Sequence, residues 1–99
     1  MINRIVLLKL NDKANQSVIA DMQAYVSRIE AELEETLAYH LTPNEAAGDD
    51  GYNWVLHSAF ADEAHMNAYR EAPLHQEFVG FCDPYTEDFL VATYQAPAL

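Results

Sequence analysis

The chain has 99 residues, 51% of them hydrophobic, and carries 16 acidic residues against five lysines and arginines. The formal charge of −11 argues against nucleic acid and against an anionic membrane surface as partners, because both are bound through clustered cations. A disordered acidic tail is also excluded, since such segments have a low apolar content. We therefore expect one globular domain over residues 1–99.

The single cysteine, Cys82, rules out a disulfide within the chain and agrees with a reducing compartment. The first ten residues lack the pattern of a secretory signal, so we expect a cytoplasmic protein. Neither Cys82 nor the four histidines fall in a metal-binding spacing. The sequence predicts no metal and no cofactor.

The first predicted strand runs from Ile2 to Leu10 and is apolar on both faces. Because side chains alternate along a strand, Arg4 shares one face with Val6, whereas Ile5 and Leu7 lie on the other. A strand that is apolar on both faces is buried on both faces, so something besides the helices must cover it.

An amphipathic helix is predicted next, from Ser17 to about Leu37, with Asn15 or Ser17 as its N-cap. Tyr25 lies at the rim of the apolar stripe, so its ring can pack inward while its hydroxyl reaches a polar group. An ordinary rim tyrosine is the alternative interpretation. The stripe recurs at spacings of three and four, as expected for a helix, at Val18, Met22, Val26, Ile29 and Leu33.

Two strands are predicted in the middle of the chain, Ala38 to Leu41 and Tyr52 to Phe60, and a last one from Phe89 to Tyr94. The first two are separated by a loop from Pro43 to Gly51, which is rich in helix-breaking and acidic residues.

Two short helices are predicted between the last two strands. Asp62 is the expected N-cap of the first, from Ala64 to Tyr69, and Pro73 ends it and opens the second. One stripe of the second helix then carries His75, Phe78, Val79 and Cys82. His75 should therefore face the core. It has either a ligand-binding or acid–base role there, or it is a structural histidine whose hydrogen bonds are satisfied within the protein.

The predicted order β-α-β-β-α(α)-β is a split βαβ pattern. It indicates an α+β, ferredoxin-like fold with a four-stranded antiparallel sheet and helices on one face. Ile5, Leu7, Val55 and Leu90 would leave an apolar patch on the other face, which monomers rarely tolerate. We therefore expect a homodimer through the open sheet face.

The motif F-x-(D)-x-x-x-M-x-x-Y-x-x-x-P-x-H-x-x-F, which begins at Phe60, resembles the stress-responsive A/B barrel (Dabb) family. The resemblance includes three strands: RIVLLKL at Arg4 to Leu10, the strand from Tyr52 to Phe60 and the closing FLVATY strand from Phe89 to Tyr94. The resemblance implies a dimeric α+β barrel, in which two open sheet faces pack together.

The resemblance extends distantly to olivetolic acid cyclase, a family member that closes a polyketide chain with two histidines and two tyrosines. By position it implies His75, Tyr69 and Tyr25 as catalytic candidates. The histidine of the first strand is replaced by Arg4, which stays protonated and can bind a carboxylate or steady an enolate but cannot act as a base.

Three functions remain open at this point. The first is binding of a small carboxylate-bearing or carbonyl ligand without chemistry, with Arg4 as the ligand-binding residue. The second is a cofactor-free lyase or cyclase acting on a β-keto or polyketide-type substrate. The third is a cofactor-free monooxygenase, by analogy of architecture alone.

Overall fold

The computed structural model describes residues 1–46, 48 and 50–97, so two positions of the predicted loop after residue 43 lie outside it. Its elements are β1 (Ile2–Leu10), α1 (Gln16–Glu32), β2 (Ala38–Pro43), β3 (Trp54–Phe60), α2 (Glu63–Glu71), α3 (Pro73–Cys82), a 3₁₀ turn (Asp83–Tyr85) and β4 (Thr86–Gln95). The predicted order of strands and helices is confirmed. Of the helices described, none combines the length and the apolar character that crossing a bilayer requires.

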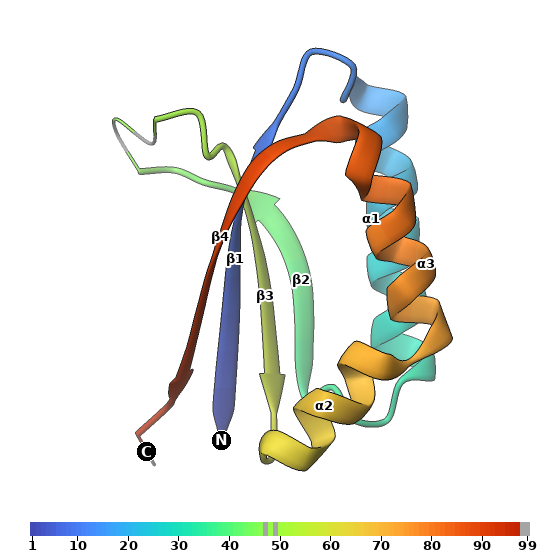
Figure 1. Cartoon of the computed structure of the whole chain (residues 1–99), viewed down its shortest axis with the longest axis vertical. Coiled ribbons are helices and arrows are strands. Elements are labelled where there is room, and N and C mark those ends of the chain that lie inside the picture. Colours follow the sequence, from blue (N-terminus) through green and yellow to red (C-terminus); the bar gives the residue numbers. More distant parts are fainter. Residues whose placement is uncertain (47, 49, 98–99) are drawn as a thin grey trace.

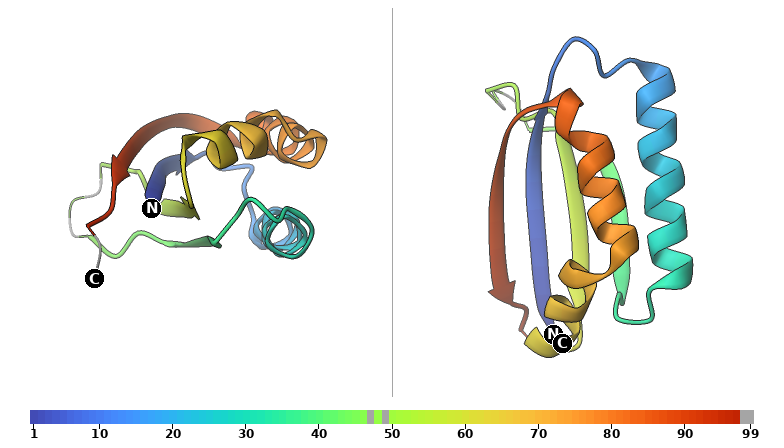
Figure 2. Two further views of the ribbon diagram at one scale, coloured as in Figure 1. Left: turned by 90° about the horizontal axis from the view of Figure 1, so that it is seen from below. Right: turned by 45° about the vertical axis from the view of Figure 1, so that its right-hand side comes forward.

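The four strands form one antiparallel sheet in the order β2-β3-β1-β4. Helices α1 and α3 lie side by side along one face of this sheet, and α2 lies at its lower end (Figure 1). Seen from below, the helices stand on one side and the other face of the sheet carries no described element (Figure 2). This is the predicted α+β, ferredoxin-like arrangement.

The register of β1 fixes which side chains reach the helix side. Arg4 lies opposite Ser58 of β3 and Thr93 of β4, and it shares its face with Val6 two residues on. Ile2 and Val6, the residues of β1 that flank Arg4 on this face, belong to the core, in which Met22 and Ile29 of α1 are fully buried. The predicted side for Arg4 is therefore confirmed.

The open face carries the apolar rows that the sequence predicts. Leu7 lies opposite Val55 and Leu90, and Ile5 is the next residue of β1 on the same face. Leu90, on the edge strand β4, is 52% exposed. The chain thus presents an apolar sheet surface to its surroundings.

The predicted end of the long helix is wrong by five residues. Helix α1 begins after Asn15, whose side chain accepts a hydrogen bond from the backbone N–H of Val18. It ends at Glu32, and the next residue, Leu33, already has an extended backbone. The hydroxyl and backbone N–H of Thr36 both donate to the Leu33 carbonyl, so a tight turn replaces the last predicted turn of the helix.

The start of α2 and that of α3 agree with the sequence. Asp62 caps α2 by accepting the backbone N–H of His65 at 2.9 Å, and Pro73 is the first residue of α3. The predicted stripe of α3 holds only in part, because His75 and Phe78 are buried whereas Val79 is 48% exposed. Phe78 belongs to the core cluster, whereas Val79 does not.

Candidate functional site

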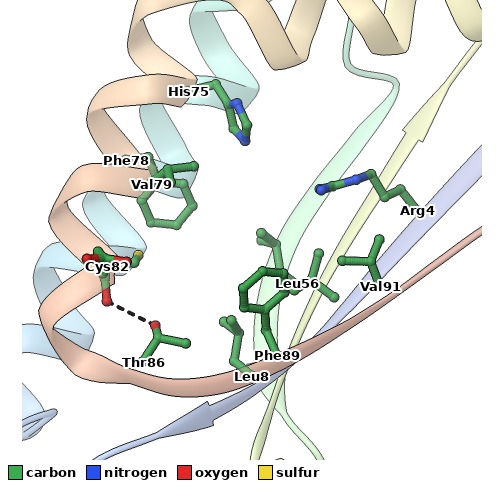
Figure 3. Close-up of a pocket in the computed structure, with 12 residues that line it drawn as sticks. Arg4, Leu8, Leu56, His75, Phe78, Val79, Cys82, Thr86, Phe89 and Val91 are labelled. Atoms are coloured by element: carbon green, nitrogen blue, oxygen red, sulfur yellow. Dashed lines mark hydrogen bonds between the residues drawn. The ribbon is translucent and has the colours of Figure 1, made fainter.

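A cavity of about 240 Å³ lies on the helix side of the sheet, between α3 and strands β1, β3 and β4. Figure 3 shows its two ends: Arg4 and His75 face one another at one, and Cys82 and Thr86 close the other, where the Thr86 hydroxyl donates to the Cys82 carbonyl at 2.9 Å. Between these ends the wall is apolar, formed mainly by Val6, Leu8, Leu56, Phe78, Phe89 and Val91.

Arg4 extends its guanidinium from β1 toward His75 (Figure 3). Within the described part of the chain this guanidinium makes no ion pair and no hydrogen bond. Arg28 is the natural comparison, because its side chain binds Glu32 at 3.3 Å and Glu77 at 3.5 Å. An arginine that finds no carboxylate in so acidic a protein leaves its donors available to a ligand.

His75 is only 9% exposed, and its orientation is fixed by the backbone. Its Nδ1–H donates to the carbonyl of Arg70 at 3.0 Å, so Nε2 is the nitrogen that carries the lone pair. Burial lowers the pKa of His75, and the nearby charges of Arg4 and Arg70 lower it further, although the bond to the Arg70 carbonyl opposes this. At neutral pH the imidazole is therefore an uncharged hydrogen-bond acceptor or base.

The ring of Tyr69 packs against the imidazole ring of His75. Their ring centroids are 4.3 Å apart, and the Tyr69 side chain is fully buried. The Tyr69 hydroxyl shares a 2.7 Å hydrogen bond with the hydroxyl of Tyr39, which comes from β2 and is 2% exposed. Burial raises the pKa of both phenols, so both stay protonated at neutral pH.

Neither Tyr25 nor Tyr69 lines the cavity, and only Tyr69 packs directly against His75. The ring of Tyr25 stacks on Phe78 at 5.5 Å and packs against Phe81 at 5.3 Å, which places it between α1 and α3. Arg28 lies 6.0 Å from the same ring. The structure thus brings Arg4, Tyr69 and His75 together, whereas Tyr25 reaches this group only through Phe78.

Neither a nucleophilic thiol nor a metal cluster is found around the cavity. Burial raises the pKa of the Cys82 thiol to about 12, so it is protonated and unreactive at neutral pH. Over the described ranges, no three His, Cys, Asp or Glu side chains are grouped so that they could hold a metal ion. Asp83 also lines the cavity, next to Cys82, so the groups that can carry charge there are Arg4, His75 and Asp83.

A second, more polar hollow of about 420 Å³ adjoins the cavity. Arg4, His75 and Val79 line both spaces. The side chains that line only the second hollow are Asn67, Arg70, Glu71 and Gln76, from the end of α2 and the start of α3. These four residues could not be identified from the sequence, because each resembles an ordinary solvated helix residue until the turn between α2 and α3 brings them together.

Comparison with known proteins places the chain in a family. The model of the stress-responsive A/B barrel domain matches residues 2–96. A protein of Arabidopsis thaliana has a similar structure, with 18% identity, a TM-score of 0.87 and coverage of 100% of this chain and 98% of the other. A dimeric ferredoxin-like protein of unknown function from Thermobifida fusca gives 18% identity, a TM-score of 0.84 and coverage of 96% and 90%.

A third similar structure is the hydroxynitrile lyase of Passiflora edulis, with 18% identity, a TM-score of 0.84 and coverage of 94% of this chain and 90% of that enzyme. No curated protein matches the sequence. At these identities the structural matches establish the fold alone, whereas the family model spans nearly the whole chain. The chain therefore belongs to the stress-responsive A/B barrel domain family.

Proposed function

We propose that the protein is a homodimer that binds a small carboxylate-bearing or carbonyl ligand in the cavity between α3 and the sheet. The observation that carries this proposal is the unpaired guanidinium of Arg4 beside His75 at the end of an apolar cavity. Arg4 is half-buried, so its guanidinium is partly removed from water next to apolar walls without a protein partner, which is unfavourable. A bound carboxylate offsets that cost through charge-assisted hydrogen bonds.

The size of the cavity limits the ligand. Cavities that enclose drug-sized molecules begin at about 300 Å³, so a volume of about 240 Å³ suits a smaller molecule. The apolar wall, with Leu56, Phe78 and Val91 among its members, favours a hydrocarbon or aromatic portion next to the acidic group. An arylalkanoic acid with one ring has this shape and polarity.

His75 gives the second polar contact to the ligand. Its neutral Nε2 accepts a hydrogen bond from a hydroxyl, or takes a proton from a carbon next to a carbonyl while Arg4 stabilises the enolate. That second use is the basis of the alternative function, a cofactor-free lyase or cyclase. In either case Tyr69 holds the imidazole ring in place, and Tyr25 holds α3 through Phe78.

The dimer is expected to form through the open sheet face. Leu7, Val55 and Leu90 form an apolar row there, and the Thermobifida fusca protein with the same fold is dimeric. A second copy would cover this apolar row.

Calorimetric titration with 3-phenylpropanoate tests the proposal. At about 0.3 kcal/mol per non-hydrogen atom, this acid should bind with a millimolar Kd. Arg4→Gln should weaken binding about tenfold or more, the effect expected of a hydrogen bond to a charged group. Arg28→Gln is the matched control, because Arg28 pairs with protein carboxylates, and it should bind as the wild type does. Absence of binding to the wild type, or equal effects of both variants, contradicts the proposal.

The alternative function has its own test. 3-Benzoylpropanoate carries both a carboxylate and a ketone, and the exchange of its hydrogens next to the ketone for deuterium is followed by NMR in D₂O. If Nε2 of His75 acts as a base, the protein accelerates this exchange, and His75→Gln abolishes the acceleration while Arg28→Gln does not. Binding without exchange supports the simple binding protein.

A further inference from the structure

The polar hollow beside the cavity brings together two of the three arginines of the chain, Arg4 and Arg70. Arg70 is an exposed residue in the last turn of α2, and within the described residues its guanidinium, like that of Arg4, forms no ion pair or hydrogen bond. The third arginine, Arg28, lies outside the hollow and binds two glutamates. The unpaired arginines are thus the ones that share a hollow.

The backbone beneath Arg70 is held in place. Its carbonyl accepts hydrogen bonds from His75 Nδ1 at 3.0 Å and from the side-chain amide of Gln76 at 2.8 Å. These bonds tie the end of α2 to the first turn of α3. The Arg70 side chain therefore extends from a backbone that is fixed relative to His75, at the edge of the hollow that Arg4 also lines.

The charge of the hollow is positive, in contrast to that of the whole chain. Arg4 and Arg70 stand against one carboxylate, Glu71, whereas the chain as a whole carries −11. Charges more than about 8 Å away are largely screened at physiological ionic strength, so an anion at this point responds mainly to the two guanidinium groups and to Glu71, which together are positive. Asn67 and Gln76 add neutral hydrogen-bonding groups.

We propose that the hollow binds a second carboxylate of the same ligand, so that the protein selects an apolar dicarboxylic acid. This inference rests on the proposed function, in which the first carboxylate binds Arg4 and the apolar part fills the cavity. The second carboxylate lies in the hollow and binds Arg70. Because Arg4 and His75 line both spaces, one small molecule can reach from the cavity into the hollow.

The test compares two probes, 3-phenylpropanoate and benzylsuccinate, which differ by one carboxymethyl group. Both are titrated into the wild type, Arg70→Gln and the control Arg28→Gln. The wild type should bind benzylsuccinate about three- to fivefold more tightly, the effect of one partly exposed charge pair. Arg70→Gln should remove this preference and leave the Kd of 3-phenylpropanoate unchanged, and Arg28→Gln should keep it.

The outcomes separate this inference from the proposed function. If 3-phenylpropanoate binds but benzylsuccinate binds no more tightly, or if Arg70→Gln keeps the preference, the second carboxylate site is refuted and the proposed function stands. If neither probe binds, the proposed function fails and the inference fails with it. Glu71→Gln provides a further check, because removing the one carboxylate of the hollow should increase the preference for benzylsuccinate.

Discussion

Removing one hydroxyl of the buried Tyr39–Tyr69 pair should destabilise the protein without weakening ligand binding. The two oxygens are 2.7 Å apart, and the side chains are 2% and 0% exposed. In Tyr69→Phe, the Tyr39 hydroxyl keeps its burial but loses this partner. Leaving a buried polar group unsatisfied costs about 1–3 kcal/mol.

The effect is large enough to measure by thermal unfolding. For a domain of this length, about 1 kcal/mol shifts the Tm by about 4–8 °C, so a loss of about 2 kcal/mol lowers it by about 8–16 °C. Tyr39→Phe should have a similar effect. The double variant should lose less stability than the sum of the two, because it removes both hydroxyls and leaves no unsatisfied partner. All variants are compared at one protein concentration, since association changes the Tm.

Tyr85→Phe is the matched control, because Tyr85 is only partly buried and its hydroxyl has no hydrogen bond to a described residue. It should change the Tm little. The reasoning is refuted if the effects of Tyr39→Phe and Tyr69→Phe add up in the double variant, or if neither exceeds that of the control. A loss of 3-phenylpropanoate binding in a folded Tyr69→Phe protein would show that the hydroxyl contacts the ligand.

Three further predictions concern stability and assembly. Burial lowers the pKa of His75 and of His57, so the unfolded chain binds more protons than the folded one below about pH 6.5. The free energy of unfolding, measured by urea denaturation, should therefore fall from pH 7.5 to 5.5. His75→Gln should reduce this fall. Stability that rises on acidification contradicts this sign. Val55→Glu places a charge in the apolar row of the open face and should give a monomer of 11.2 kDa by sedimentation equilibrium, whereas the exposed control Leu37→Glu should stay dimeric. Asp62→Ala removes the N-cap of α2 and should cost about 1 kcal/mol in thermal unfolding; an unchanged Tm would show that this cap contributes nothing.

Much of the fold could be predicted because local rules decide it. Asp62 and Pro73 act through the backbone next to them. The alternation of side chains along β1 places Arg4 on the same face as Val6, which is the helix side of the sheet. The end of α1 was missed because Leu33 continues the helical period. The Thr36 turn that overrides this period depends on the path of the chain into β2.

The candidate site was less predictable, because it depends on packing between distant elements. Helical phase places Tyr25 at the rim of its stripe, but only the arrangement of α1 against α3 directs its ring to Phe78 instead of the cavity. The unpaired state of Arg4 depends on where all the acidic side chains lie in space. Arg70 becomes notable only after the turn between α2 and α3 places it beside His75.

The central claim is that the ligand binds on the helix side of the sheet with its carboxylate at Arg4. Intermolecular NOEs between 3-phenylpropanoate and the isotope-labelled protein test it most directly. We predict NOEs from the phenyl ring to the cavity side chains Leu56, Phe78 and Val91, with the Nε–H signal of Arg4 shifting on titration while that of Arg28 does not. NOEs to Ile5 and Leu7 of the open face instead, with an unmoved Arg4 signal, would contradict the account.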